Sequence, residues 1–261
     1  MTAPRGLSSL PHPAQAAISA VLGRDQSAYH AVEREGGLYA ENPKHALRAD
    51  FTRDGIRIRT GAQRWGLSFS GYGYGGALGG GTAVAPKAKA NRVEYRRGDL
   101  TEWWVNGPLG LEQGFTLARA PGKRTGEPLS FLLTLSGDLT AALEPSGDGV
   151  RLSRADGTVA LRYSGLIAHD AAGRELRAWL TVHAARLSLR VDDTEAQYPV
   201  VVDPFVQQAH QNQCPQQNNE HSACGSKRSY RHGIFITCEL GLLASKRIKA
   251  QQPFIVFMCN S

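Results

Sequence analysis

The chain has 261 residues, of which 41% are hydrophobic and 20% are charged, with a formal net charge of +7. This composition is typical of a folded, turn-rich protein and excludes a disordered one. From position 210 onward six basic residues oppose two acidic ones, so the preceding body is close to charge balance and we expect no nucleic-acid partner. No apolar run approaches the ~20 residues that a membrane span requires.

The first predicted element is a short helix within an N-terminal segment, residues 1–27. Pro13 suits the first helical turn, and Gly23 marks the expected end of the helix. Three apolar side chains would share one face, namely Ile18, Val21 and Leu22. The segment has too few large apolar residues, and no basic start beyond Arg5, to predict a convincing secretory signal peptide.

Two predicted β-units follow, at residues 28–118 and 129–209, with residues 119–128 as the linker. In the first unit, ADFTRDGIRIRT alternates apolar residues with arginine around Asp54-Gly55, which indicates a hairpin, and RWGLSFSG continues the alternation. In the second unit, short strands are separated by Asp-Gly and Ser-Gly turns. The pattern predicts an all-β fold of antiparallel meanders, arranged as a β-sandwich or as two packed units.

A glycine-rich segment after residue 70 satisfies G-x-G-x-x-G with Gly71, Gly73 and Gly76. A dinucleotide site needs a helix next, and the further glycines and Pro86 forbid one. We therefore interpret the segment as a loop between strands and expect no cofactor. Its two tyrosines are candidates to flank a ligand groove, and they are Tyr72 and Tyr74.

Trp103 and Trp104 are adjacent, so in a strand their side chains point to opposite faces. An exposed tryptophan on a β-sandwich is a platform on which sugar rings stack. This makes both tryptophans candidate ligand-binding residues, together with Tyr72 and Tyr74. The interpretation that we favour is that both tryptophans are buried.

Glu102 and Glu112 are the candidates for the acid and base of a glycosidase, although sequence does not fix their separation in space. No G-x-S-x-G nucleophile elbow or H-E-x-x-H zinc helix is present. His169 and His183 are expected to be structural. The Asp148-Gly149 and Asp156-Gly157 pairs are expected at hairpin turns, since calcium-loop spacing is missing. We expect no catalytic residue and no metal site in the body.

A series of segments carries a family resemblance: NRVEYRRGDLTEWWVNGPLGLEQGFTLARAPG, PLSFLLTLSGDLTAALEPSGDGVRL, TVALRYSGLIAHDAAGRELRAWL and LSLRVDDTEAQYPVVVDPFVQQA. They resemble the N-terminal β-rich region of large bacterial surface proteins, which precedes FG-GAP, integrin-α-like β-propeller repeats. The resemblance covers most of residues 28–209. It implies an exported, non-enzymatic module whose partner is the downstream propeller of the same protein, and it brings no catalytic residues.

The tail, residues 210–261, departs from that family, in which glycine- and aspartate-rich repeats follow. It is rich in glutamine and holds all four cysteines. Candidate zinc ligands are Cys214, His221, Cys224, His232, Cys238 and Cys259, but no C-x2-C pair is present. Two disulfides are an alternative for an exported chain. The interpretation that we favour is a disordered or frame-shifted tail.

From these observations we expect a non-enzymatic structural or interaction module of an extracellular or cell-surface FG-GAP repeat protein, truncated before its repeats. The alternative function is a carbohydrate-binding β-sandwich module. A glycan or other surface partner is not identified by the sequence.

Overall fold

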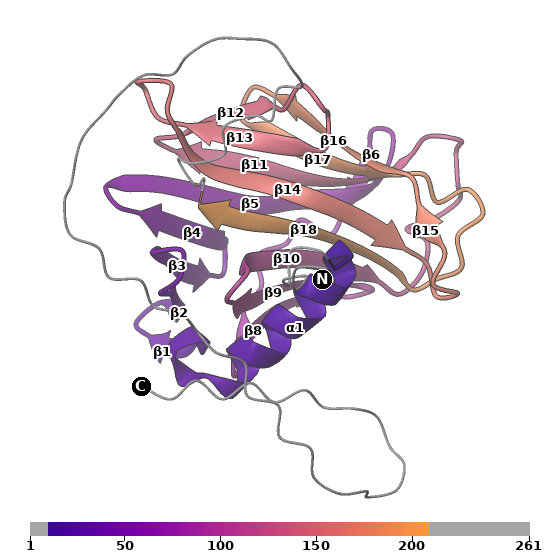
Figure 1. The fold of residues 1–261 in the computed structure, drawn as a ribbon. Helices are drawn as coiled ribbons and strands as arrows, with labels where there is room; N and C mark the ends of the chain where they lie inside the picture. Colours follow the sequence, from indigo (N-terminus) through magenta and orange to yellow (C-terminus); the bar gives the residue numbers. More distant parts are fainter. Residues whose placement is uncertain (1–9, 209–261) are drawn as a thin grey trace, which may run out of the picture. The chain divides into compact units, whose positions relative to one another are not determined.

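Strands make up most of the computed structural model, which describes residues 10–208. They form two antiparallel sheets of nine strands each, accompanied by one α-helix (Figure 1). The prediction of an all-β, sandwich-like fold with a short N-terminal helix is therefore confirmed. The predictions for the tail, including its cysteines and histidines, lie outside the described residues.

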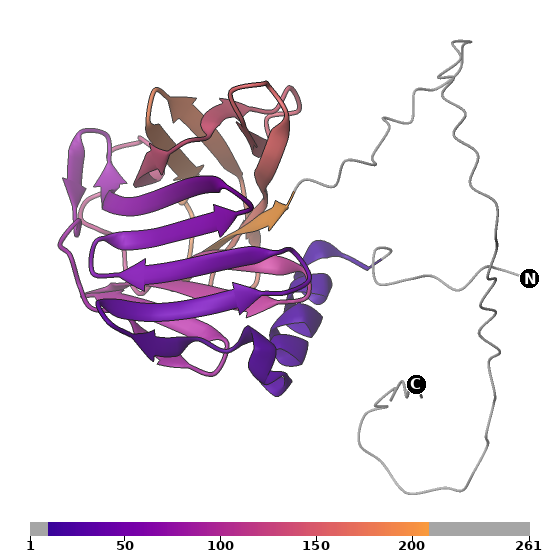
Figure 2. The same cartoon turned by 90° about the vertical axis from the view of Figure 1, so that its left-hand side faces the viewer.

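The first sheet has the strand order β1-β2-β3-β4-β5-β11-β17-β16, with β6 paired to β5. Its strands β1 to β5 are the indigo and purple arrows that face the viewer in Figure 2. The strand bounds are β1 (Val32–Arg34), β2 (Gly37–Asn42), β3 (Leu47–Thr52), β4 (Gly55–Thr60), β5 (Gln63–Tyr74), β6 (Ala77–Gly79), β11 (Leu129–Gly137), β16 (Ala178–His183) and β17 (Arg186–Val191).

The second sheet has the order β12-β13-β14-β18-β10-β9-β8-β7, with β15 paired to β14. Its strands are β7 (Lys87–Lys89), β8 (Arg92–Arg97), β9 (Leu100–Gly107), β10 (Gly110–Leu117), β12 (Thr140–Leu143), β13 (Gly149–Ser153), β14 (Val159–His169), β15 (Glu175–Leu176) and β18 (Val200–Gln208).

Each sheet combines strands from both halves of the chain. In the first sheet β5 pairs with β11, and in the second sheet β10 pairs with β18. The ranges 28–118 and 129–209 therefore do not form separate sheets. The segment 119–128, expected as a linker between two units, connects β10 of the second sheet to β11 of the first.

Alternate residues of both sheets point inward and form one hydrophobic core. The aromatic rings of Phe115 and Phe131, from opposite sheets, stack with 5.0 Å between their centroids. Phe51 and Trp104 meet edge to face at 6.2 Å, again across the two sheets. Rings of this size bury large apolar areas, so these contacts stabilise the packing of the two layers.

The hairpin predictions are confirmed at two glycines. Gly55 follows the Arg53-Asp54 turn between β3 and β4 with φ +138°, and Gly157 lies between β13 and β14 with φ +83°. Both angles lie in the region that L residues with a side chain rarely adopt. The inward positions expected next on β5 are buried: Trp65, Leu67 and Phe69.

The glycine-rich segment differs from the prediction of a loop. Strand β5 continues through Gly71 and Gly73 as far as Tyr74, and β6 then pairs back onto it after a turn at Gly75-Gly76. A Cβ on Gly73 would lie 2.2 Å from the carbonyl oxygen of Ala77. The glycines thus allow two strand backbones to approach, which local sequence patterns do not separate from loop flexibility.

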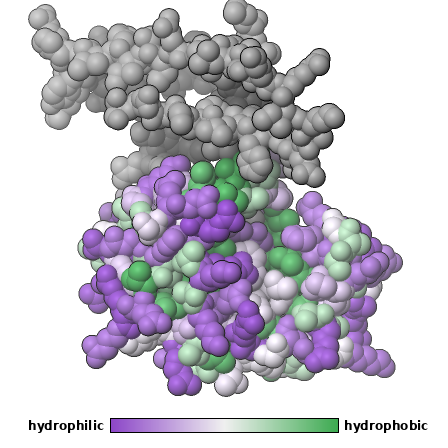
Figure 3. Space-filling view, turned by 90° about the horizontal axis from the view of Figure 1, so that it is seen from below, coloured by the Kyte–Doolittle hydropathy of each residue, from purple (hydrophilic) through white to green (hydrophobic). Residues whose placement is uncertain are grey.

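Helix α1 (His12–Asp25) also differs from the prediction, because it does not end at Gly23 and is not seated on its large apolar residues. Val21 and Leu22 are 46% and 38% exposed, whereas three small residues are buried, namely Ala16, Ser19 and Gly23. Figure 3 shows the face of the molecule that is seen from below the view of Figure 1. On that face hydrophobic side chains lie in separate patches among hydrophilic ones. Within residues 10–208, no helix is long and apolar enough to cross a membrane.

Candidate functional site

The four aromatic candidates do not share one accessible face. Trp104 faces the core and is 0% exposed, while Trp103 lies on the outer face of the second sheet and is 7% exposed. Tyr72 is only partly buried and stacks on core Phe131, and Tyr74 is buried with its hydroxyl on Asp193. The expectation that both tryptophans are buried is confirmed.

Glu102 lies inside the sandwich, where it accepts hydrogen bonds from three side chains. Its Oε2 accepts from Nη1 of buried Arg97 at 2.9 Å, and its Oε1 accepts from Trp104 Nε1 at 3.1 Å and Gln113 Nε2 at 3.0 Å. Burial raises the pKa of Glu102, while the Arg97 charge and these hydrogen bonds favour the carboxylate. Tyr163 extends the network by donating to Gln113 Oε1 at 2.7 Å.

Glu112 lies on the opposite face of the second sheet from Glu102, as the pairs Glu112–Val105 and Phe115–Glu102 show. The two candidates for a glycosidase acid and base are therefore not brought together. Glu112 instead hydrogen-bonds with Asp203 of β18. We call Glu112 and Asp203 the carboxyl pair.

Burial raises the pKa of Asp203, and the neighbouring Glu112 carboxylate raises it further. Burial also raises the pKa of Glu112, which accepts the hydrogen bond. Two carboxyl groups in contact cannot both ionise cheaply, so the pair retains one proton. Retaining glycosidases hold their carboxyl groups about 5 Å apart, so a directly hydrogen-bonded pair does not fit that geometry.

Trp103 covers the sheet beside this carboxyl pair. A Cβ on Gly114 would lie 2.0 Å from the Trp103 ring, so only glycine lets the indole lie there. The ring nitrogen donates to Thr116 Oγ1 at 3.0 Å, and Arg92 Cζ lies 4.6 Å from the ring centroid. Both faces of the ring are thus engaged by the protein, which leaves little of it for a sugar.

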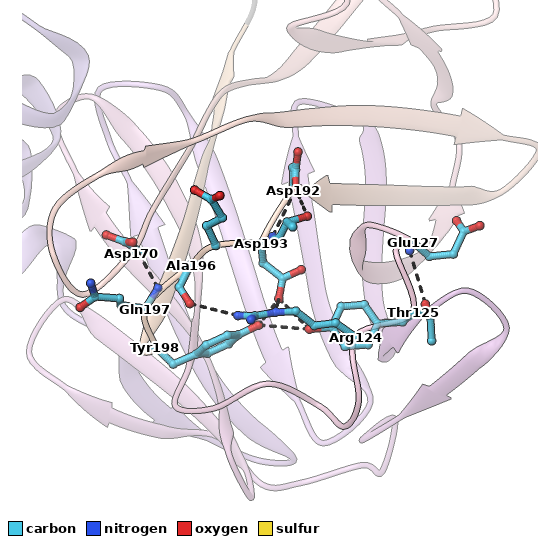
Figure 4. A network of polar contacts seen from close by, with 12 residues as sticks. Arg124, Thr125, Glu127, Asp170, Asp192, Asp193, Ala196, Gln197 and Tyr198 are labelled. Atoms are coloured by element: carbon cyan, nitrogen blue, oxygen red, sulfur yellow. Dashed lines mark hydrogen bonds and ion pairs between the residues drawn. The ribbon is translucent and has the colours of Figure 1, made fainter.

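A second polar network ties the 119–128 segment to the fold (Figure 4). Asp193 Oδ2 accepts hydrogen bonds from Tyr74 at 2.6 Å, Tyr198 at 2.5 Å and Arg124 Nε at 3.3 Å. Arg124 also donates to the Ala196 carbonyl oxygen at 3.0 Å. Burial and the hydrogen bond to Asp193 raise the pKa of Tyr74 and of Tyr198. These contacts stabilise the segment 119–128, which connects the second sheet to the first.

The remaining candidates occupy turns and strand ends. His169 ends β14 half-buried, and exposed His183 ends β16. Asp156 accepts hydrogen bonds from Thr158 within its turn, and these lower its pKa. Within residues 10–208, no group of three or more His, Cys, Asp or Glu side chains is placed to hold a metal ion.

Asp203 and Trp179 are polar and aromatic residues that the sequence patterns did not single out. Trp179 is half-buried on β16 with Arg177 Cζ 5.2 Å from its ring centroid. Asp203 is set among valines in VVVDPF, and an aspartate in a strand that is apolar on either side is a signal for a buried partner. The identity of that partner required the β10–β18 pairing.

Comparison of the chain with known protein families found no match, and comparison with curated proteins found none either.

Proposed function

We propose that the chain is a non-enzymatic structural or interaction module of a bacterial extracellular or cell-surface protein, in which it precedes FG-GAP β-propeller repeats. One observation carries the non-enzymatic part of the proposal. The two glutamates suited to acid and base catalysis, Glu102 and Glu112, lie on opposite faces of a sheet, and each is engaged by a structural partner.

The position of β18 is consistent with a role as a rigid lead-in to a following domain. β18 is paired on one side with β14 and on the other with β10, so it lies inside the second sheet and not at an edge. A domain attached after such a strand is held by a backbone with hydrogen bonds on both sides. This arrangement transmits orientation better than a frayed edge strand.

The alternative of a carbohydrate-binding module has no support from a tryptophan platform, because Trp103 and Trp104 are both buried. A glycan would need another surface. The outer face of the first sheet offers hydroxyl side chains on β5 and β11, where Ser70 and Thr134 hydrogen-bond at 2.8 Å.

The non-enzymatic proposal is tested by measuring sugar release from a panel of polysaccharides and chromogenic glycosides. The full chain is compared with Glu112→Gln and Asp203→Asn, which remove the acidic proton carriers of the carboxyl pair. We expect no release above the buffer blank for any of the three. Release by the unchanged chain that either substitution abolishes would overturn the proposal and assign catalysis to the carboxyl pair.

A further inference from the structure

Three arginines stand side by side on the outer face of the first sheet. Arg48 of β3 pairs in register with Arg59 of β4, and Arg59 pairs in register with Arg64 of β5. Neighbouring strands are about 4.8 Å apart, so the three side chains leave the sheet at that spacing. We call Arg48, Arg59 and Arg64 the arginine row. The strands that carry it face the viewer in Figure 2.

The arginine row is only partly neutralised. Arg48 lies 3.5 Å from Glu41 and Arg59 lies 3.1 Å from Asp50, and the two arginine side chains remain 64% and 45% exposed. Among residues 10–208, Arg64 makes no side-chain ion pair. Like charges directly opposite each other destabilise a sheet, and an anion placed between them removes that cost.

Two hollows adjoin the arginine row. The first has a volume of 660 Å³ and is lined by all three arginines and Glu41, together with the β2–β3 and β4–β5 turns. The second has a volume of 420 Å³ and is lined by Asp50, Arg57, Arg59, Arg64, Trp65, Gly66 and Gly137. The two hollows adjoin at Arg59 and Arg64, which line both, and we call them together the basic depression. Gly66 lines the second hollow, and because it has no side chain it does not fill the space there.

We propose that this depression binds the acidic groups of a linear polysaccharide. Guanidinium groups bind carboxylate and sulfate oxygens through paired N–H donors, and a row of them matches charges repeated along a chain. Next to the row the face bears hydroxyl groups, from Ser68 and Ser136, that suit sugar hydroxyls. This inference rests on the proposed function and names the ligand class of that module.

Polysaccharide is favoured over single-stranded nucleic acid because the depression lacks a stacking platform. Binding of unpaired bases relies on aromatic rings open to the ligand. Of the aromatic residues nearest the row, Tyr39 is buried with Arg34 Cζ 3.4 Å over its ring, and the Trp65 side chain points into the core.

The test measures binding of the full chain to dextran sulfate and to dextran, which share a backbone and differ in charge. We expect binding to dextran sulfate that weakens with added salt, and none to dextran. Arg59→Gln combined with Arg64→Gln should weaken binding at least about tenfold. The control, Arg96→Gln combined with Arg119→Gln, removes the same charge from exposed positions of the second sheet and its loop and should change binding less than about twofold.

Further binding measurements distinguish which acidic group of the polysaccharide is recognised. Polygalacturonate tests carboxylate groups, and binding to it alone or to dextran sulfate alone identifies which acidic group is recognised. Equal loss in both double variants would show general attraction to a basic protein and overturn the inference. Tighter binding to oligodeoxythymidylate would overturn it in favour of nucleic acid. Degradation of either polysaccharide would instead contradict the proposed non-enzymatic function, so the two failures are distinguishable.

Discussion

The acidic side chains Glu102, Glu112 and Asp203 of the second sheet are accommodated in two different ways. Burial raises the pKa of Glu102, and the hydrogen bonds from Arg97 and from two neutral donors oppose that rise. The Glu112 and Asp203 pair lacks a comparable set of hydrogen-bond donors. Asp203 Oδ1 is shielded from solvent and has no hydrogen-bond partner among the described residues. A charge left in that position is costly, so the proton stays on the pair.

This proton predicts a pH dependence of stability. The pKa of Asp203 is raised to about 9 in the folded protein and is about 4 in the unfolded chain. The contribution of Asp203 to the stability of the fold is therefore complete below about pH 4 and is lost as the pH rises toward 9. Asp203→Asn stays neutral and can still donate to Glu112. Relative to the unchanged chain, its free energy of unfolding should be at least about 1 kcal/mol more favourable at pH 8 than at pH 5. Urea unfolding at both pH values measures this, and an equal difference at each would contradict a shared proton.

At the scale of elements, α1 is fixed by close backbone approach and not by large apolar side chains. A Cβ on Gly107 of β9 would lie 2.4 Å from the carbonyl oxygen of Ser19, and Ser19 Oγ accepts the Leu109 N–H at 2.9 Å. Asn91 donates to the Ala20 carbonyl oxygen at 3.0 Å. The helix therefore docks through glycine, serine and backbone groups onto the end of β9.

Gly23→Ala tests this docking because two effects oppose each other. Helix propensity favours alanine by about 1 kcal/mol, but the added Cβ would lie 2.1 Å from the Asn106 carbonyl oxygen. Overpacking against rigid backbone dominates, so we expect a net loss of about 2 kcal/mol by urea unfolding. Ala17→Gly, at an exposed site of the same helix, should cost only about 1 kcal/mol. A higher melting temperature for Gly23→Ala would show that the helix is loosely docked.

At the scale of the whole molecule, the two sheets are interdependent because each contains strands from both halves of the chain. The loop between β10 and β11 is itself fixed by Arg124 on Asp193. The core side chains of β18 end with Val206, which is fully buried. The core that the structure describes thus lies within residues 10–208.

A chain that ends at Ala209 should consequently keep the single cooperative thermal transition of the full chain, with a midpoint within a few degrees. The physical reason is that the apolar alternation of the sequence, which can build a core, ends near Val206. Calorimetry of both chains checks this, and the full chain is also measured with reductant and with chelator. Loss of the transition on shortening, or a drop of several degrees with either reagent, would make the tail a structural element.

Local sequence patterns were sufficient to predict individual strands and turns. Alternation of period two identified the strands and their buried faces, and Asp54-Gly55 determined a hairpin, because turn geometry depends on a few adjacent residues. The same hairpin places Arg48 beside Arg59. From the alternating pattern alone, each arginine is predicted only to point outward.

The pairing of distant strands could not be predicted from local patterns and is seen in the folded structure. β18 lies between β14 and β10, and that placement brings Asp203 to Glu112 and separates Glu112 from Glu102. The folded structure also places Gly23 of α1 against Asn106 of β9, whereas the sequence indicated a helix end at Gly23. Long-range pairing is selected by burial summed over the whole core against the entropy of closing long loops, and no short segment contains that balance.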